Sequence, residues 1–464
     1  MYRNHYKILF AVYSIIYFIS LLNDLNGRFV LDSISSIQQI LGEVPLSNWH
    51  PFIYTFGFIY PLYILFGSDF SNVTLFQAIL FYILNLWILI CLLKTIKHSF
   101  FPKAQLLQLI LFGIYLLHPL QFNFPFILWK DTPYTLIYTI CIICFFFTRI
   151  NPFVLLITFC YGQLIRHFGN FILLITTLIF FYRTEIQKVY SSKRLFYLIP
   201  LCFLSLSLFI NYKLDRIDGI QNFIVESLAI VKCQNKKFPL FCSSEAILAK
   251  SCVSSSNVDT CIAESIEYRK FFDTICKPNL VKCKNEAYRI RFYNIFQYIY
   301  MRSVYIYKII YRPLGDFSGE DGKLFLACFH SKSDKPLFNY FDNFSQRYSR
   351  FIYIWSLRMC WSQLLGLFSF MSICVLHFKY KKFLSTDLDN KLLLFLIVTG
   401  SGFASVLFGP FTANCFRYLW PYSQGALLVF LFVIPLFARI KENKSQENSL
   451  INVSSMKRKS ENAD

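Results

Sequence analysis

Charged residues are scarce in this chain. Only 16% of its 464 residues are Asp, Glu, Lys or Arg, whereas a soluble domain carries about a quarter. Hydrophobic residues make up 56% of the chain and aromatic residues 19%. This composition excludes an ordinary soluble globular fold. Together with the long apolar runs, it predicts an integral membrane protein with many spans.

Acidic residues are rarer than basic ones. The chain has 26 Asp and Glu residues and 46 Lys and Arg residues, which gives a net charge of +20. Basic residues of membrane proteins collect in cytoplasmic loops and near anionic headgroups, which explains this excess. We therefore expect no nucleic acid partner. The chain also lacks an internal repeat, a phosphate-cradling glycine motif and a small-residue cleavage site after the apolar segment Lys7 to Leu22. We interpret that segment as a retained first span.

The apolar runs predict an all-α polytopic protein of about ten transmembrane helices. The spans are expected near 7–23, 74–93, 104–120, 133–149, 151–165, 170–182, 193–211, 357–378, 389–410 and 419–439. Segment 51–67 is also apolar, but counting it as a span would put Lys94, Lys97 and Lys103 outside. We expect it to be an interfacial helix instead.

The run 151–182 is too long for one comfortable helix, and basic residues flank it at both ends. A hairpin with the tip "RHFGN", Arg166 to Asn170, keeps both flanks cytoplasmic.

With ten spans, both termini are cytoplasmic. The expected organisation is an N-terminal bundle, 1–211, that includes a first outer loop, 24–73. A large extracytoplasmic loop, 212–350, follows, then the C-terminal helices, 351–440, and a disordered basic tail, 441–464.

Seven of the fifteen cysteines fall in the large loop, whereas most of the others sit singly in apolar runs. Such clustering is typical of disulfides in an oxidising compartment. Zinc is the alternative, but the loop has no CxxC pair and no histidines at ligand spacing. Because seven is odd, Cys415 is a candidate eighth partner. The seven are Cys233, Cys242, Cys252, Cys261, Cys276, Cys283 and Cys328.

The expected topology brings four polar clusters to the outer face. Each mixes charged or amide side chains with aromatic ones, so together they predict one extracytoplasmic site at the bilayer surface. The clusters are Asp24, Asp32, Gln38, Gln39, Trp49 and His50 in the first loop; Trp129, Lys130 and Asp131 in "LWKDTP"; Arg166, His167 and Asn170 in "LIRHFGN"; and Asn414, Arg417 and Tyr418 in "NCFRYLWPY".

The residue types indicate the chemistry of this site. Carboxylates accept a proton from a hydroxyl or hold a divalent cation. Lys130, Arg166 and Arg417 suit a phosphate, which arginine meets with a planar fork of donors. A substrate with a phosphate at headgroup level and an oily tail among the helices, such as a lipid-linked phospho-sugar, satisfies both requirements.

The order of these motifs resembles an uncharacterised bacterial family of predicted membrane glycosyltransferases. The motifs are "DSISSIQQILG" with "SNWHPFIYT", then "LWKDTP", "LIRHFGN" and "RYLWP". That family is similar to the GT-C class, which includes protein mannosyltransferases. The resemblance covers residues 1–211 and about 389–439. One departure is at the tip, where the family reads closer to Arg-His-Asn-Gly. Here Asn170 is the substitute for the missing asparagine.

The resemblance implies transfer of a sugar from a polyprenyl-phosphate donor, with inversion, on the outer face of a bacterial inner membrane. It implies that Asp32 is the catalytic carboxylate and that Asp131 is the second outer acid. Arg417, helped by Lys130 or Arg166, then binds the donor phosphate, with Gln38, Trp49, His50, His167, Asn170 and Tyr418 as further substrate contacts. The acceptor is a lipid, glycan or protein. The residues assign no definite cofactor, and a divalent cation, Mg²⁺ or Mn²⁺, held by Asp32 and Asp131 stays an open alternative.

Simpler interpretations remain for each cluster. Asp32 is also a good N-cap for a helix beginning at Ser33, and Lys130 with Asp131 also fits a surface ion pair. Arg166 also fits a side chain that extends to the headgroups. For the whole chain, the alternative functions are a transporter or flippase, or a polymerase or ligase for lipid-linked glycans. Charges collected on one face, without a repeat, count against a transporter.

Overall fold

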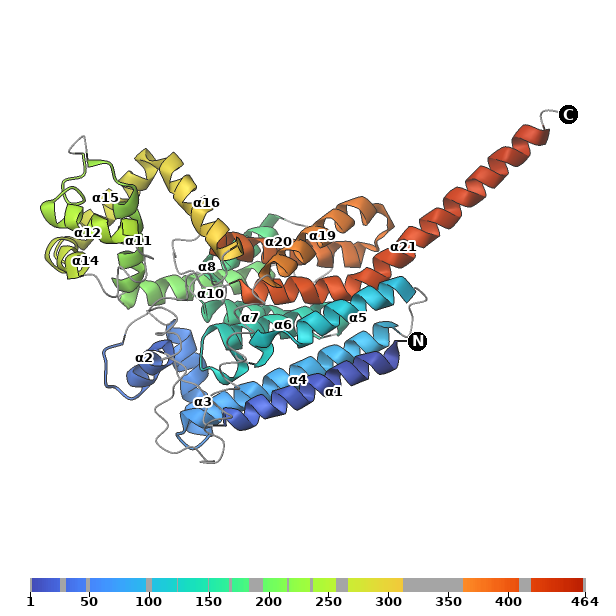
Figure 1. Ribbon diagram of the computed structural model, residues 1–464, viewed down its shortest axis with the longest axis horizontal. Helices are drawn as coiled ribbons and strands as arrows, with labels where there is room; N and C mark the ends of the chain where they lie inside the picture. The colour runs from blue at the N-terminus through green and yellow to red at the C-terminus, as the bar shows by residue number, and fades with distance from the viewer. Residues whose placement is uncertain are drawn as a thin grey trace.

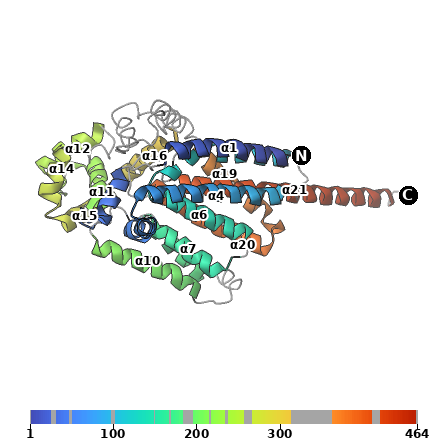
Figure 2. The ribbon, with the colours of Figure 1, turned by 90° about the horizontal axis from the view of Figure 1, so that it is seen from below.

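The computed structural model describes residues 2–25, 31–46, 51–96, 102–122, 124–148, 150–166, 169–182, 195–214, 217–233, 237–255, 266–311, 362–408 and 419–461. Within these ranges the protein is helical and has no strand. Long helices run side by side along one direction and form a bundle (Figure 1). A group of shorter helices lies beyond one end, and the C-terminal helix extends beyond the other (Figures 1 and 2).

Ten helices make up the bundle. They are α1 (Arg3–Asn23), α4 (Phe70–Ile96), α5 (Pro102–Leu116), α6 (Asp131–Phe147), α7 (Pro152–Leu164), α8 (Gly169–Tyr182), α10 (Leu195–Lys213), α19 (Ser362–Tyr380), α20 (Thr386–Phe408) and α21 (Trp420–Glu461). Each of the ten predicted spans falls on one of these helices.

Four helices of the described chain are long and apolar enough to cross a membrane: Arg3–Asn23, Phe70–Thr95, Leu364–Phe383 and Trp420–Lys441. A bent pair, Pro102–Leu116 with Leu120–Phe126, makes up to five. Five further apolar helices of the described chain have 10–17 residues, and Asp131–Phe147, for example, has 17, at the lower limit for a span. The protein therefore has the features of a helical membrane protein, and the count of about ten spans stays a prediction.

Two helices lie at the centre of the bundle. α6 is buried along most of its length, and α21 is buried almost continuously from Leu419 to Val433. Helices that are apolar on every side are typical of such interior positions. The contact between α19 and α21 is close, because a Cβ atom on Gly366 would overlap with Ser423. Small residues let apolar helices approach in this way.

The first predicted outer loop is structured. It contains α2 (Leu31–Ile40), then a π-helical segment η1 (Ile53–Ile59) that continues into α3 (Tyr60–Leu65). The expected helix over 51–67 is thus present as one continuous helical segment, Ile53–Leu65, whose first part is π-helical. The two short 3₁₀ turns η2 (Pro119–Phe122) and η3 (Phe124–Phe126) lead into α6.

The region 217–311 has a core of its own. It consists of α11 (Ile217–Ile230), α12 (Ser244–Ser255), α14 (Ile266–Phe271), η5 (Phe272–Cys276), α15 (Leu280–Tyr293) and α16 (Ile295–Tyr311). Two disulfides join Cys233 to Cys242 and Cys276 to Cys283, as expected for an oxidising compartment. The Cys252 side chain, Cys261, Cys328 and Cys415 lie outside the described residues.

A buried carboxylate, Glu226 of α11, lies at the centre of this region. Its two oxygens each lie 2.6 Å from a guanidinium nitrogen, one of Arg291 and one of Arg302. Burial raises the pKa of Glu226 to about 7, and the two arginines oppose that shift. The cluster ties α11 to both α15 and α16.

The C-terminal tail differs from the expectation of a disordered segment. α21 continues as one helix to Glu461 and leaves the bundle (Figure 1). The tail is rich in Ser, Lys, Asn and Glu, of which Lys and Glu favour helices.

Candidate functional site

One end of the bundle gathers the first residues of α6, the turn between α7 and α8, and the first residues of α21. α2, α3 and the 217–311 region lie at the same end (Figure 1). All four predicted clusters belong to these segments or lie next to them along the chain.

The α6 start and the end of α7 are joined by an ion pair between Asp131 and Arg166. The Arg166 guanidinium lies 3.0 Å from the Asp131 carboxylate. The side chains are 0% and 2% exposed, so both charges are buried. The alternative of a surface ion pair between Lys130 and Asp131 is therefore wrong about exposure, since Lys130 is buried too. Two clusters 35 residues apart in the sequence contribute to one charged centre.

Two tyrosines cover the Arg166 guanidinium. Its carbon Cζ lies 4.9 Å from the ring centroid of Tyr134 and 5.9 Å from that of Tyr422. The Tyr134 hydroxyl is 3.0 Å from the Tyr422 hydroxyl and 3.2 Å from Oε1 of Gln163. Rings at these distances attract a guanidinium through their π faces. The arginine is therefore held by α6, α7 and α21 together.

The α7–α8 turn that carries Arg166 depends on Gly169. A Cβ atom at this position would overlap with the backbone carbonyl oxygen of Gln163. That oxygen also accepts a hydrogen bond from the Arg166 amide at 3.4 Å. Backbone cannot move aside as a flexible side chain can, so the turn requires glycine.

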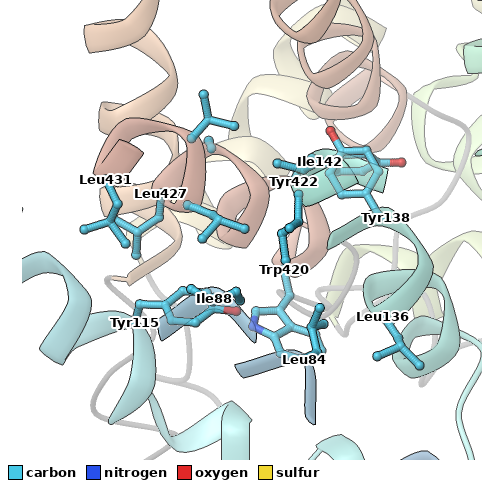
Figure 3. Close-up of a cluster of buried hydrophobic side chains, with 14 of the residues drawn as sticks. Leu84, Ile88, Tyr115, Leu136, Tyr138, Ile142, Trp420, Tyr422, Leu427 and Leu431 are labelled. Atoms are coloured by element: carbon cyan, nitrogen blue, oxygen red, sulfur yellow. The ribbon is translucent and has the colours of Figure 1, made fainter. Parts of the chain in front are cut away.

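The first residues of α21 pack on the segment before α6. The Trp420 ring lies edge-on to Phe124 at 4.7 Å, and Phe124 lies edge-on to Trp129 at 5.4 Å. Figure 3 shows Trp420 beside Leu84 of α4, with Tyr422 and Tyr138 on the other side of α21. These contacts bring the α21 start, which follows Arg417 and Tyr418 in the sequence, against the segment that carries Lys130 and Asp131.

The inner face of α2 packs against the same segment. The Ser33 hydroxyl donates a hydrogen bond of 2.6 Å to the carbonyl oxygen of Leu128. One turn later, the Thr55 hydroxyl donates to Ser36 at 3.5 Å and joins α2 to η1. Asp32 precedes Ser33 in the first turn of α2, so its backbone lies close to the Lys130–Asp131 segment. The Asp32 side chain lies outside the described residues.

The remaining predicted residues have different surroundings. Gln38 is half-buried on α2, and Asn170 accepts a 2.5 Å hydrogen bond from Ser207 of α10. That bond joins α8 to α10, so Asn170 has a helix-packing contact. Trp49, His50, His167, Arg417 and Tyr418 lie outside the described residues.

A divalent cation was expected, if at all, between Asp32 and Asp131. In the part of the chain that the structure describes, no three His, Cys, Asp or Glu side chains come close enough to hold a metal ion. The Asp131 carboxylate faces a guanidinium, which competes with a cation for the same oxygens. In the structure, Asp131 is therefore the ion-pair partner of Arg166.

Sequence reasoning missed Tyr134, Gln163 and Tyr422. A signal for the first two was present, because Tyr134 lies three residues after Asp131 and Gln163 three residues before Arg166. Residues at that spacing share one face of a helix. For Tyr422 no local signal exists, since α21 meets α6 only in the folded bundle.

Comparison with known proteins adds no relative. No protein-family model, curated protein or solved structure matches this chain.

Proposed function

We propose that this protein is an integral membrane glycosyltransferase that moves a sugar from a polyprenyl-phosphate donor to an acceptor on the extracytoplasmic face. The observation that carries the proposal is the buried Asp131–Arg166 ion pair at the end of the bundle. A buried guanidinium with two tyrosine rings over it is a preformed partner for an anion. A carboxylate-bearing helix start, that of α2, lies against the same segment.

The proposed reaction is a single displacement. The acceptor hydroxyl oxygen forms a bond to the anomeric carbon while the bond from that carbon to the phosphate oxygen breaks, which inverts the centre. Asp32 takes the hydroxyl proton, and the polyprenyl phosphate leaves with the electron pair of the broken bond. Arg166 and Lys130 stabilise the negative charge that collects on the leaving phosphate, together with Arg417.

We assign Asp131 a supporting role. Its carboxylate is already paired with the Arg166 guanidinium. Its contribution is to hold and orient the guanidinium. Asp32 is thus the candidate base, and Asp131 is a positioning residue.

The test is transfer by purified protein in nanodiscs, followed as release of polyprenyl phosphate from labelled polyprenyl-phosphate sugars. Asp32→Asn should lower the rate about 10²–10⁴-fold, the usual contribution of a general base. Arg166→Ala should lower it about 10²–10³-fold, as for one charge-stabilising donor. Asp273→Asn removes an exposed carboxylate from η5 and is the matched control.

The variants must first show the wild-type melting temperature and elution profile. Wild-type rates in both Asp32→Asn and Arg166→Ala would exclude the proposed mechanism. Equal losses in Asp273→Asn would show that the assay reports folding and not chemistry. If no labelled donor is turned over by the wild type while lipid-linked sugar crosses the bilayer in vesicles, the protein is a flippase.

A further inference from the structure

A groove opens between α6, α7, α8 and α20, away from the Asp131–Arg166 site. It encloses about 730 Å³ of space free of atoms, a volume that includes open solvent at its mouth. Its floor is formed by buried side chains such as Tyr138, Ile142 and Phe395. Phe146, Phe159 and Leu394 are only partly buried and lie at the mouth.

The groove wall presents almost no polar groups that could bind water. The Tyr138 hydroxyl lies 2.7 Å from Oγ1 of Thr399, and the Thr176 hydroxyl donates to the carbonyl oxygen of Ile172 at 2.7 Å. Both hydroxyls of the wall are therefore hydrogen-bonded within the protein. A space needs two to four polar partners to hold an ordered water, so this groove suits a hydrocarbon chain. It follows α6 from Tyr138 to Phe145, about 10 Å at 1.5 Å per residue.

A pair of opposite charges lies at one end of the groove. The Lys391 ammonium is 5.9 Å from the centroid of Phe145, a lining residue, and 3.1 Å from a carboxylate oxygen of Asp387. Lys391 also precedes the lining residues Leu394, Phe395 and Val398 by three, four and seven positions. These spacings put all four residues on one face of α20.

The ion pair between Lys391 and Asp387 can open, so that each side chain binds a charged group of a ligand instead. The Lys391 side chain is 24% exposed and that of Asp387 64% exposed, so their attraction is weak. A zwitterionic headgroup carries the complementary charges: its phosphate meets Lys391 and its ammonium meets Asp387. A purely anionic headgroup would meet the Asp387 carboxylate as a like charge.

We propose that this groove binds one chain of a bilayer phospholipid with a zwitterionic headgroup, of the phosphatidylethanolamine type, and that Lys391 and Asp387 recognise the headgroup. The site lies at the end of α6 opposite to Asp131 and does not depend on the transferase proposal. In the predicted topology this end faces the cytoplasm, so the lipid belongs to the inner leaflet.

Native mass spectrometry of the full-length protein tests this proposal. The protein is released from nanodiscs that contain phosphatidylethanolamine and phosphatidylglycerol in equal amounts. The wild type should retain one phosphatidylethanolamine. Leu394→Trp fills the mouth and should abolish retention, whereas Leu86→Trp, on an exposed position of α4 outside the groove, should not.

The charge variants leave the groove wall intact and keep the proposal testable if Leu394→Trp does not fold. Lys391→Gln should lower phosphatidylethanolamine retention roughly fivefold, the effect of one cation near a headgroup. Asp387→Asn should shift the preference toward phosphatidylglycerol. Equal retention in Leu394→Trp and Leu86→Trp, or unchanged selectivity in both charge variants, would overturn the proposal. So would displacement of the bound lipid by an equal amount of added polyprenyl phosphate.

Discussion

Replacing one partner of the Asp131–Arg166 pair should cost more stability than replacing both. Asp131→Leu leaves a guanidinium that is 2% exposed without the carboxylate 3.0 Å away. Breaking a buried pair in this way typically costs about 3–5 kcal/mol. The Tyr134 and Tyr422 rings contact the cation in the wild type and in the variant alike, so they do not change this difference. The expected cost of Asp131→Leu is therefore about 3–5 kcal/mol.

The double variant Asp131→Leu with Arg166→Met removes both charges and keeps apolar volume at both positions. Exchanging a buried ion pair for apolar side chains is often neutral or stabilising, so the double variant should recover most of the loss. The free energies of unfolding of the wild type, both single variants and the double variant, measured in mixed SDS and detergent micelles, form a double-mutant cycle.

The cycle should show a coupling of at least about 2 kcal/mol between the two positions, which is in the range for residues in direct contact. Additive costs, with the double variant as unstable as the sum of the single variants, would refute the reasoning. That result would mean that Asp131 and Arg166 act through other neighbours and not through each other.

Two further predictions concern backbone and pH. Gly169→Ala should destabilise the protein by several kcal/mol, because its Cβ would meet the Gln163 carbonyl, whereas Gly113→Ala, facing only Leu9 side-chain atoms at 3.4 Å, should change melting little. Because Glu226 has a folded pKa of about 7 against 4.5, the folded state binds the extra proton, so stability falls by up to about 3 kcal/mol between pH 4.5 and 7. The hydrogen-exchange protection of α11 and α15 should fall over this pH range, and Glu226→Gln should remove the fall. Protection that rises with pH would contradict the prediction, because it would mean that the two arginines outweigh burial in setting the pKa of Glu226.

The sequence was sufficient for the helical architecture. Apolar runs long enough for helices are local features, and each predicted span coincides with a helix. The structure differs from the prediction at the C-terminal tail, where local helix propensity explains the difference. The tail after Lys441 continues α21, because its Lys and Glu residues favour a helix.

The sequence by itself determined which residue types are available at the end of the bundle: one acid at the start of α6 and one arginine after α7. Only the tertiary structure decided that they pair and that Tyr134 and Tyr422 cover the guanidinium. It also decided that the Asp131 carboxylate is buried and faces the Arg166 guanidinium. The physical reason is that the cost of a buried charge depends on its neighbours within a few ångströms, and these neighbours come from helices far apart in the chain.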